Sequence, residues 1–292
     1  MFKQNLSLVL RVLMAWCGAL ALSASASGAT PWTTLPPVPE LPQPVESGHT
    51  SIGDARLWWG RYNVAAPGVP VLLLHGGLGS SNYFSHLIPV LISDGRSVIA
   101  IDSRGHGRST LGTAKLSYAL MTSDVIAVLS QLRVAKVDIV GWSDGGIIGL
   151  ELAIGHPELV SRLYAFGANV DPDGERPGAE NTPTFHEYLS RGGQDYARLS
   201  PTPDGFGSLV QNVSSMWSTE PHLTHAQLQS IKAPVTVADG QFEEAILPQH
   251  TFYIAQTIPN ANLELLPNVS HFAMLQQPDT FNESVIFFLH RR

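Results

Sequence analysis

One serine between glycines is the feature of this sequence best placed to do chemistry. Gly-Trp-Ser-Asp-Gly-Gly at 141–146 follows an apolar run at 137–140 and precedes another at 147–154, which indicates a strand that turns directly into a helix. Such a turn strains the backbone and holds the Ser143 hydroxyl clear of the sheet, while the glycines remove clashes with neighbouring elements. The amide N–H of Asp144 starts the helix at its positive end. Ser143 is therefore the candidate nucleophile.

A nucleophilic serine needs a general base and an oxyanion hole. His271 is the candidate base because it follows the last predicted strand and precedes the last predicted helix, and of the eleven histidines it alone has the required place in the chain order. The stretch His-Gly-Gly-Leu at 75–78 lets the backbone approach a developing negative charge, with the Gly77 amide as donor and Leu78 as the alternative. His75 is interpreted as a residue that shapes this turn.

The acid that would orient the histidine stays open among four carboxylates. Asp239, Glu243 and Glu244 all lie at or beyond the end of the predicted strand at 233–239. Glu243 is the first choice, since it lies past the turn that Gly240 allows, whereas Asp239 is expected to shape that turn. Asp171, after the preceding strand, is the outside candidate.

Strands and helices alternate along the chain in the way that positions such groups at one edge of a sheet. Alternation of this kind predicts parallel strands joined by right-handed helical crossovers. The strand-like segments are 49–53, 55–63, 70–77, 96–102, 136–140, 160–168, 233–239 and 261–266.

Residues 170 to about 230 interrupt this alternation. They contain no strand-like run, and a structureless loop of that length is improbable inside a compact domain, so the segment is predicted to form a helical cap over the sheet. Phe185 and Tyr188 within it are interpreted mainly as packing inside the cap. Leu78, Trp142 and Trp217 are the residues expected to contact substrate.

The N-terminal residues predict export. Residues 1–26 combine two basic residues, an apolar stretch and small residues around an Ala-x-Ala site, which is typical of a secretory signal peptide, so we expect a secreted or periplasmic protein. The only cysteine, Cys17, would leave with that peptide, which excludes thiolate chemistry and disulfides in the mature chain. Residues 27–48, rich in proline, are predicted to be an extended tether ahead of a domain at 49–292.

The composition and charge of the chain limit the classes of partner that we expect. Hydrophobic residues make up 44% and charged residues 14% of the chain, as expected for a packed globular domain. The formal net charge of −7, with no basic cluster, argues against nucleic acid and against stable membrane association after signal cleavage. The oligomeric state stays open.

The motifs together resemble those of the α/β-hydrolase superfamily over residues 49–292. The matching stretches are 75–77, 102–109, 141–146, 231–244 and 270–274. They are most similar to serine-nucleophile members with a helical cap, such as esterases, C–C hydrolases and biphenyl-hydrolase-like proteins. The resemblance implies a mostly parallel eight-stranded sheet flanked by helices. It places the nucleophile on Ser143, the base on His271, the acid on Glu243 and the oxyanion donors on Gly77 and Asp144.

The predicted reaction is acyl transfer to water through an acyl-enzyme, without a metal or an organic cofactor. The expected substrate is a small, partly apolar carboxylic ester. The alternatives are a C–C bond hydrolase, a lactonase, an aminopeptidase or an acyltransferase with the same triad, and a non-catalytic ligand-binding homologue. The Asp144 carboxylate has two interpretations, a contact for a cationic substrate group and a cap for the helix that begins there.

Overall fold

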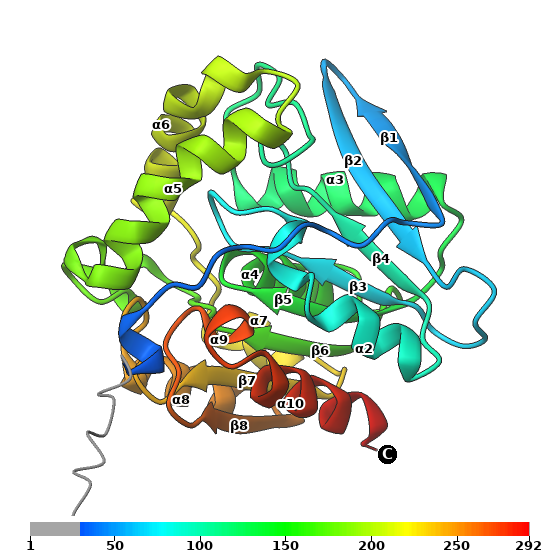
Figure 1. Cartoon of the computed structure of the whole chain (residues 1–292). Coiled ribbons are helices and arrows are strands. Elements are labelled where there is room, and N and C mark those ends of the chain that lie inside the picture. Colours follow the sequence, from blue (N-terminus) through cyan, green and yellow to red (C-terminus); the bar gives the residue numbers. More distant parts are fainter. Residues whose placement is uncertain (1–29, 292) are drawn as a thin grey trace, which may run out of the picture.

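The fold is built on one eight-stranded sheet, as the sequence predicts (Figure 1). The computed structural model describes residues 30–291, so the expected signal peptide at 1–26 lies outside the described residues. The strand order is β1-β2-β4-β3-β5-β6-β7-β8. β2 pairs antiparallel with β1 and with β4, and all other pairs are parallel. The strands are β1 (Glu46–Ile52), β2 (Ala55–Tyr62), β3 (Val71–Leu74), β4 (Val98–Ile101), β5 (Val137–Trp142), β6 (Val160–Phe166), β7 (Val235–Gly240) and β8 (Ala261–Leu266).

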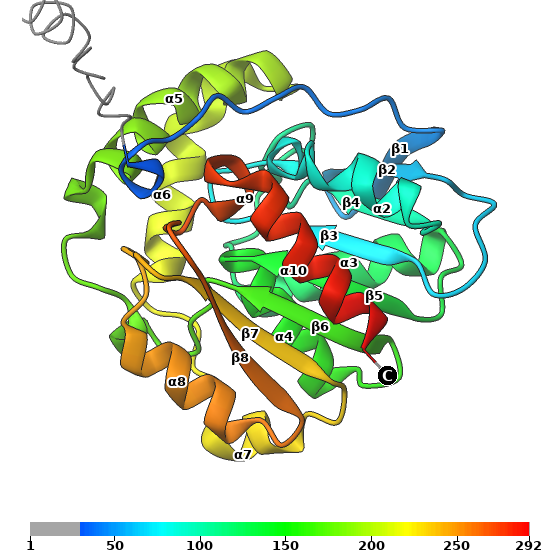
Figure 2. The same cartoon turned by 60° about the horizontal axis from the view of Figure 1, so that its bottom comes forward.

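Helices cover both faces of this sheet. In Figure 2, α2 and α10 lie in front of the central strands, and α3 and α4 lie behind them. α7 packs beside α4, and α8 packs beside α7. The helices are α2 (Leu87–Ser93), α3 (Tyr118–Gln131), α4 (Asp144–Gly155), α5 (Pro183–Leu199), α6 (Phe206–Trp217), α7 (His225–Ser230), α8 (Pro248–Thr257), α9 (Ala273–Gln276) and α10 (Pro278–His290). Short 3₁₀ helices are η1 (Pro31–Thr33), η2 (Ser81–Phe84), η3 (Pro172–Gly174), η4 (Ala179–Asn181) and η5 (Pro203–Gly205).

The central strands are continuous apolar runs because both of their faces are covered. Every residue of β3, β4 and β5 is buried. A strand buried on both sides has no solvent face to mark with polar residues, so its sequence does not alternate. The edge strands β1 and β8 carry exposed positions instead.

The segment expected to form a cap contributes α5 and α6, which lie together beyond the carboxyl ends of the parallel strands (Figure 1). Its last helix, α7, returns to the sheet and packs beside α4. No helix in the range 30–291 is long and apolar enough to cross a membrane.

The proline-rich residues 30–45, which we call the N-terminal strap, are placed differently from the expected tether. They are extended after η1, as proline favours, and β1 begins at Glu46, slightly before the expected domain start at 49. The N-terminal strap does not stand apart from the domain, however. Leu35, Val38 and Leu41 pack against the core, and in Figure 1 the strap crosses the molecule to reach β1. These apolar side chains are what hold it to the surface.

The turn from β5 into α4 is packed too tightly for side chains at its glycines. A Cβ atom at Gly141 would overlap the carbonyl oxygen of Gly145, and a Cβ atom at Gly145 would overlap the carbonyl oxygen of Leu74 on β3. Because both obstacles are backbone atoms, neither can move without displacing a strand or a helix. Glycine at these positions therefore allows α4 to begin directly where β5 ends.

Replacing Gly145 with alanine should lower the free energy of unfolding by about 3 kcal/mol or more, since the added methyl group overpacks the β3–α4 contact. Gly155→Ala, at the other end of α4, is the matched control, because a Cβ atom there would meet nothing within 4 Å. That control should leave stability unchanged or raise it by up to about 1 kcal/mol. Urea unfolding measures both changes, and equal stability of the two variants would contradict the packing argument.

Candidate active site

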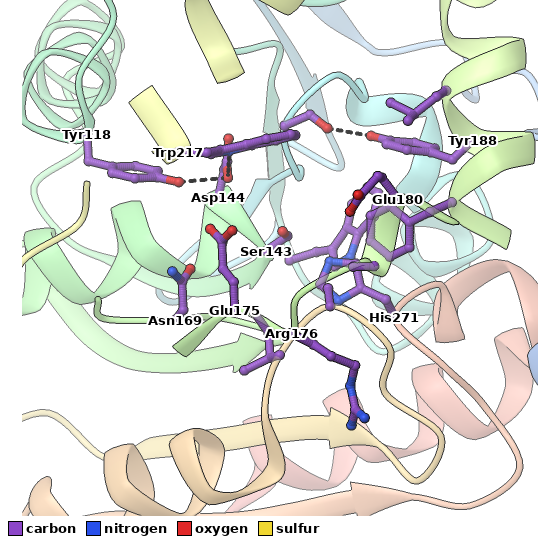
Figure 3. Close-up of a pocket in the computed structure, with 17 residues that line it drawn as sticks. Tyr118, Ser143, Asp144, Asn169, Glu175, Arg176, Glu180, Tyr188, Trp217 and His271 are labelled. Carbon is purple, nitrogen blue, oxygen red and sulfur yellow. Dashed lines mark hydrogen bonds between the residues drawn. The ribbon is translucent and has the colours of Figure 1, made fainter. Parts of the chain in front are cut away.

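Ser143 occupies the strained residue of the β5–α4 turn. Its backbone angles are φ 53° and ψ −120°, a conformation that non-glycine residues rarely adopt. Its amide donates to the carbonyl of Phe166 at 2.8 Å, and its carbonyl accepts from the amides of Gly146 and Ile147. These bonds anchor the turn, and the Ser143 side chain faces a pocket at the carboxyl edge of the sheet (Figure 3).

His271 lies in the loop between β8 and α9 and borders the same pocket as Ser143 (Figure 3). Its Nδ1 is 2.9 Å from Oε1 and 3.1 Å from Oε2 of Glu243. This contact places the ring proton on Nδ1 and leaves Nε2 as the basic nitrogen. No hydrogen bond joins His271 to Ser143 within residues 30–291. Catalytic hydrogen bonds of ligand-free enzymes are often long and shorten when substrate binds.

The His271–Glu243 pair is buried from water, with each side chain only 3% exposed. Burial lowers the pKa of His271, because removal from water disfavours the imidazolium form. Burial also raises the pKa of Glu243, although the amides of Ala245 and Ile246 donate to its Oε1 and oppose that shift. The neutral imidazole required of a general base is therefore favoured.

Asp239, an alternative acid, forms no hydrogen bond with the histidine in the described residues. Its Oδ2 accepts from the hydroxyl of Thr251 at 2.7 Å, and its Oδ1 accepts from the amide of Gly240 at 3.0 Å. Burial, and then the neighbouring Glu243 carboxylate, raise the pKa of Asp239 well above its usual value. Glu243 is the carboxylate that is hydrogen-bonded to the imidazole ring, so the geometry favours Glu243 as the acid.

The other two candidate acids also lack a bond to the histidine. Glu244 accepts from the hydroxyl of Ser270 at 3.1 Å, so it contacts the residue before His271. Asp171 accepts from Nδ1 of His222 at 2.8 Å on the surface. Among the four carboxylates considered from the sequence, the structure brings only Glu243 to the His271 ring.

The predicted oxyanion donors are the backbone amides of Gly77 and Asp144, two residues that lie close together at the pocket. The amide N–H groups of Gly77 and Asp144 donate to no other group in the described part of the chain, and both residues line the pocket. A Cβ atom at Gly77 would overlap Trp217 and lie 2.5 Å from Oδ2 of Asp144, so the close approach requires glycine. Two amide N–H groups that are not already hydrogen-bonded and lie beside the nucleophile can stabilise the oxyanion of a tetrahedral intermediate.

The structure corrects part of the predicted substrate contacts. Trp142 and Trp217 line the pocket as expected, whereas Leu78 does not. Leu78 has a φ of 63°, and it borders a separate small cavity with Tyr83 and Tyr196. Leu78 thus combines a left-handed backbone conformation with a position at this second cavity.

Several pocket residues have no marking in the sequence or were interpreted otherwise. Phe185 and Tyr188 from α5 line the pocket, in addition to packing within the cap as expected. Tyr118, Asn169 and Glu175 were not predicted, because each lies at the start of a helix or in a loop without a local motif. Knowing that the ends of β5 and β6 meet would have pointed to Asn169.

The Asp144 carboxylate is buried, with only 2% of the residue exposed. Its Oδ1 accepts from the Tyr118 hydroxyl and from the Trp217 indole, each at 2.9 Å (Figure 3). Its Oδ2 has no partner in the described residues. Burial raises the pKa of Asp144 to about 6, and removal from water together with the Asp144 charge raises the pKa of Glu175 to about 7. The pocket thus carries two carboxyl groups, Asp144 and Glu175, neither of which forms an ion pair within residues 30–291, although Arg176 also lines the pocket.

A family model described as "alpha/beta hydrolase fold" matches residues 69–208 of this chain. The solved structure titled "Est816 as an N-Acyl homoserine lactone degrading enzyme" matches with a TM-score of 0.65 and 25% identity, over 82% of this chain and 100% of that one. The chain belongs to the α/β-hydrolase superfamily. Its sheet order and the position of Ser143 after β5 agree with that membership.

The names of two relatives of this α/β hydrolase refer to different bonds. It is 26% identical to the sn-1-specific diacylglycerol lipase ABHD11 of Danio rerio over 254 residues, 75% of this chain and 78% of that protein. It is also 26% identical over 258 residues to RutD of Variovorax paradoxus (strain S110), a protein named for carbamate hydrolysis, covering 79% of this chain and 96% of that protein. These similarities support hydrolase activity for this chain. The bond that it cleaves has to be inferred from the residues of the pocket.

The acid assignment can be tested by exchanging each carboxylate for its amide. Glu243→Gln should lower kcat by about 10³- to 10⁴-fold, because the neutral amide cannot stabilise the imidazolium. Asp239→Asn should cost less than about tenfold, since Asp239 is hydrogen-bonded to Thr251 and to the Gly240 amide and not to His271. Steady-state hydrolysis of p-nitrophenyl acetate measures both, with circular dichroism to check folding. An inactive Asp239→Asn beside an active Glu243→Gln would show that Asp239 is the acid.

Proposed function

We propose that this α/β hydrolase is an exported serine hydrolase that cleaves carboxylic esters of modest size. The observation that carries the proposal is the buried His271–Glu243 pair, whose histidine lines the same pocket as the strained Ser143. Burial of an acid–base pair costs stability, and such cost is expected where it serves catalysis. The export part rests on the character of residues 1–26 alone.

The geometry supports a two-step reaction. His271 Nε2 takes the proton of Ser143 as its hydroxyl oxygen attacks the substrate carbonyl, and the Gly77 and Asp144 amides stabilise the oxyanion. Glu243 holds the imidazolium, which then protonates the leaving alcohol as the acyl-enzyme forms. Water, deprotonated by the same histidine, attacks the acyl-enzyme, and the histidine then returns the proton to the Ser143 oxygen as its bond to the acyl group breaks and the carboxylic acid leaves.

Pocket size favours short acyl groups. The cavity volume is about 190 Å³, and Trp142, Phe185 and Trp217 supply apolar walls. A pocket of that size with aromatic walls favours a short acyl chain over a long one.

Hydrolysis of p-nitrophenyl esters from acetate to palmitate tests the proposal. The full-length chain should be recovered from the periplasm or the medium, and kcat/KM should be highest for acetate or butyrate. Ser143→Ala should lower the rate by about 10⁴-fold or more while leaving the melting temperature near that of the parent. No turnover of any ester, together with no fluorophosphonate adduct on Ser143, would overturn the proposal.

A second candidate function is hydrolysis of esters or amides whose acyl part carries an ammonium group. The observation in its favour is the unpartnered Oδ2 of Asp144, with Glu175 on the same pocket wall. An uncompensated buried carboxylate is costly, and a substrate ammonium bound there would supply the missing charge and hydrogen bond. This alternative corresponds to the aminopeptidase-like activity left open by the sequence.

Asp144→Asn separates the two substrate classes. The variant keeps the backbone amide and an acceptor for Tyr118 and Trp217 but loses the charge, so kcat/KM for an amino-acid ester should fall at least about tenfold more than that for the matching uncharged ester. In the parent, the preference for the charged ester should be complete above pH 7 and disappear as the pH falls through about 6, where Asp144 becomes protonated. Equal loss with both esters would remove the ammonium site.

A further inference from the structure

Tyr188 of helix α5 contacts the loop at residues 76–79, which carries the predicted oxyanion donor Gly77. Its hydroxyl donates a hydrogen bond of 2.5 Å to the carbonyl oxygen of Gly77 (Figure 3). The ring is 4% exposed and contacts Tyr83, Trp142 and Phe272, with ring centroids 5.1–6.2 Å away. A side chain held by three aromatic neighbours has little rotamer freedom, so its hydroxyl is fixed relative to the loop.

The loop that it contacts is a turn with two available orientations of its central peptide. Residues 76–79 form a β-turn closed by the Gly79 amide on the carbonyl of Gly76 at 3.1 Å. Leu78, at the third position, has a φ of 63°, which corresponds to a type II turn. A non-glycine residue prefers the type I form at this position, in which the peptide between Gly77 and Leu78 is turned over. The Tyr188 hydrogen bond to the Gly77 carbonyl holds the less favourable orientation in place.

Peptide orientation matters here because the same turn carries the oxyanion donors. The Gly77 amide is the predicted donor and the Leu78 amide the alternative, and the Leu78 N–H belongs to the peptide whose carbonyl Tyr188 binds. Turning that peptide over would remove the Leu78 N–H and shift the Gly77 backbone. Oxyanion stabilisation depends on donors that already point at the developing charge.

The N-terminal strap in turn holds α5. Arg191, one helical turn after Tyr188, donates from Nη1 to the carbonyl of Pro36 at 3.2 Å and from Nη2 to the carbonyl of Leu35. Its Nε is 2.8 Å from Oε1 of Glu187 on the same helix. Proline-rich chain offers such carbonyls because it has few amides and forms no internal hydrogen bonds. In Figures 1 and 2 the strap runs beside α5 on its way to β1.

The start of the N-terminal strap also lies near the loops that carry the acid Glu243 and the base His271. Nε2 of Gln276 donates to the carbonyl of Thr34 at 3.0 Å, and Oε1 of the same side chain accepts from the amide of Ser270, the residue before the base, at 2.7 Å. Trp32 stacks on Phe242, the residue before the acid, with ring centroids 3.9 Å apart. One segment therefore contacts α5 and the residue before the acid directly, and the residue before the base through Gln276 of α9.

We infer that Tyr188 is a positioning residue for the oxyanion hole and that the N-terminal strap fixes it there by binding α5 through Arg191. The inference rests on the proposed ester hydrolysis. Tyr188 acts through the Gly77–Leu78 peptide and contacts no reacting atom, so its effect should appear in the transition state and not in substrate binding.

Tyr188→Phe tests the inference by removing only the hydroxyl. The kcat for p-nitrophenyl acetate should fall about tenfold with KM changed less than twofold, and the rate of fluorophosphonate labelling should fall in parallel. Tyr196→Phe is the matched control, since Tyr196 lies on the same helix and its hydroxyl is near Thr202, away from the triad. The control should keep the parent's kcat.

A double-mutant cycle tests the role of the N-terminal strap. Arg191→Gln should lower kcat severalfold in the parent and have little further effect in Tyr188→Phe, because both changes act on one hydrogen bond. Arg56→Gln on β2 is the control, since this exposed arginine forms no ion pair within residues 30–291 and only its backbone amide, which the change keeps, is hydrogen-bonded to a side chain.

The outcomes separate this inference from the proposed function. An active parent with an unchanged kcat in Tyr188→Phe would overturn the positioning role. A fall confined to KM would assign Tyr188 to substrate binding, which also overturns it. Strictly additive losses would overturn the link through Arg191. A parent that hydrolyses no ester would instead mean that the proposed function has failed.

Discussion

The close approach of α4 to β3 at Gly145 is the constraint on which the site depends. Glycine at position 145 lets α4 lie directly against the Leu74 carbonyl, where no side chain would fit, so the helix begins immediately at the end of β5. Ser143, the residue between the strand and the helix, then adopts strained backbone angles. That strain points the Ser143 side chain into the pocket and leaves the Asp144 amide free at the positive end of the helix. Nucleophile position and oxyanion donor therefore follow from one packing requirement.

Electrostatics divide the buried carboxylates around this turn into different roles. Glu243 is bonded to His271 and to two backbone amides, so its charge is compensated from several sides. Asp239 lies close to Glu243 without a cation of its own, and two carboxylates in one buried place cannot both ionise easily. Asp144 keeps one oxygen unpartnered beside the nucleophile. The last of these is the feature that points to substrate chemistry, since no described residue supplies a partner for that oxygen.

The pocket is assembled from parts of the chain that are distant in sequence. The parallel strands bring Ser143 and the His271 loop to one edge, and α5 and Trp217 close the space above them. The N-terminal strap lies against this arrangement from outside and contacts residues on α5 and α9. Its proline content suits the role, because an extended chain with little conformational freedom loses little entropy when it docks.

Particular residues show how much of the fold and of the site could be predicted from the sequence. The glycines of the β5–α4 turn, the continuous apolar strands and the late histidine are local signals with a direct physical cause, so the sheet and the likeness to α/β hydrolases could be predicted. The preference for Glu243 over Asp239 needed only the reach of the chain past Gly240. By contrast, Leu78 was wrongly expected at the substrate, since a side chain on a turn takes its direction from a backbone angle that the sequence does not show. The pocket contacts of Phe185, Tyr188 and Glu175, and the docking of the proline-rich segment, were decided by tertiary structure alone. They depend on which surfaces pack together, and packing between distant segments leaves no periodic pattern in either one.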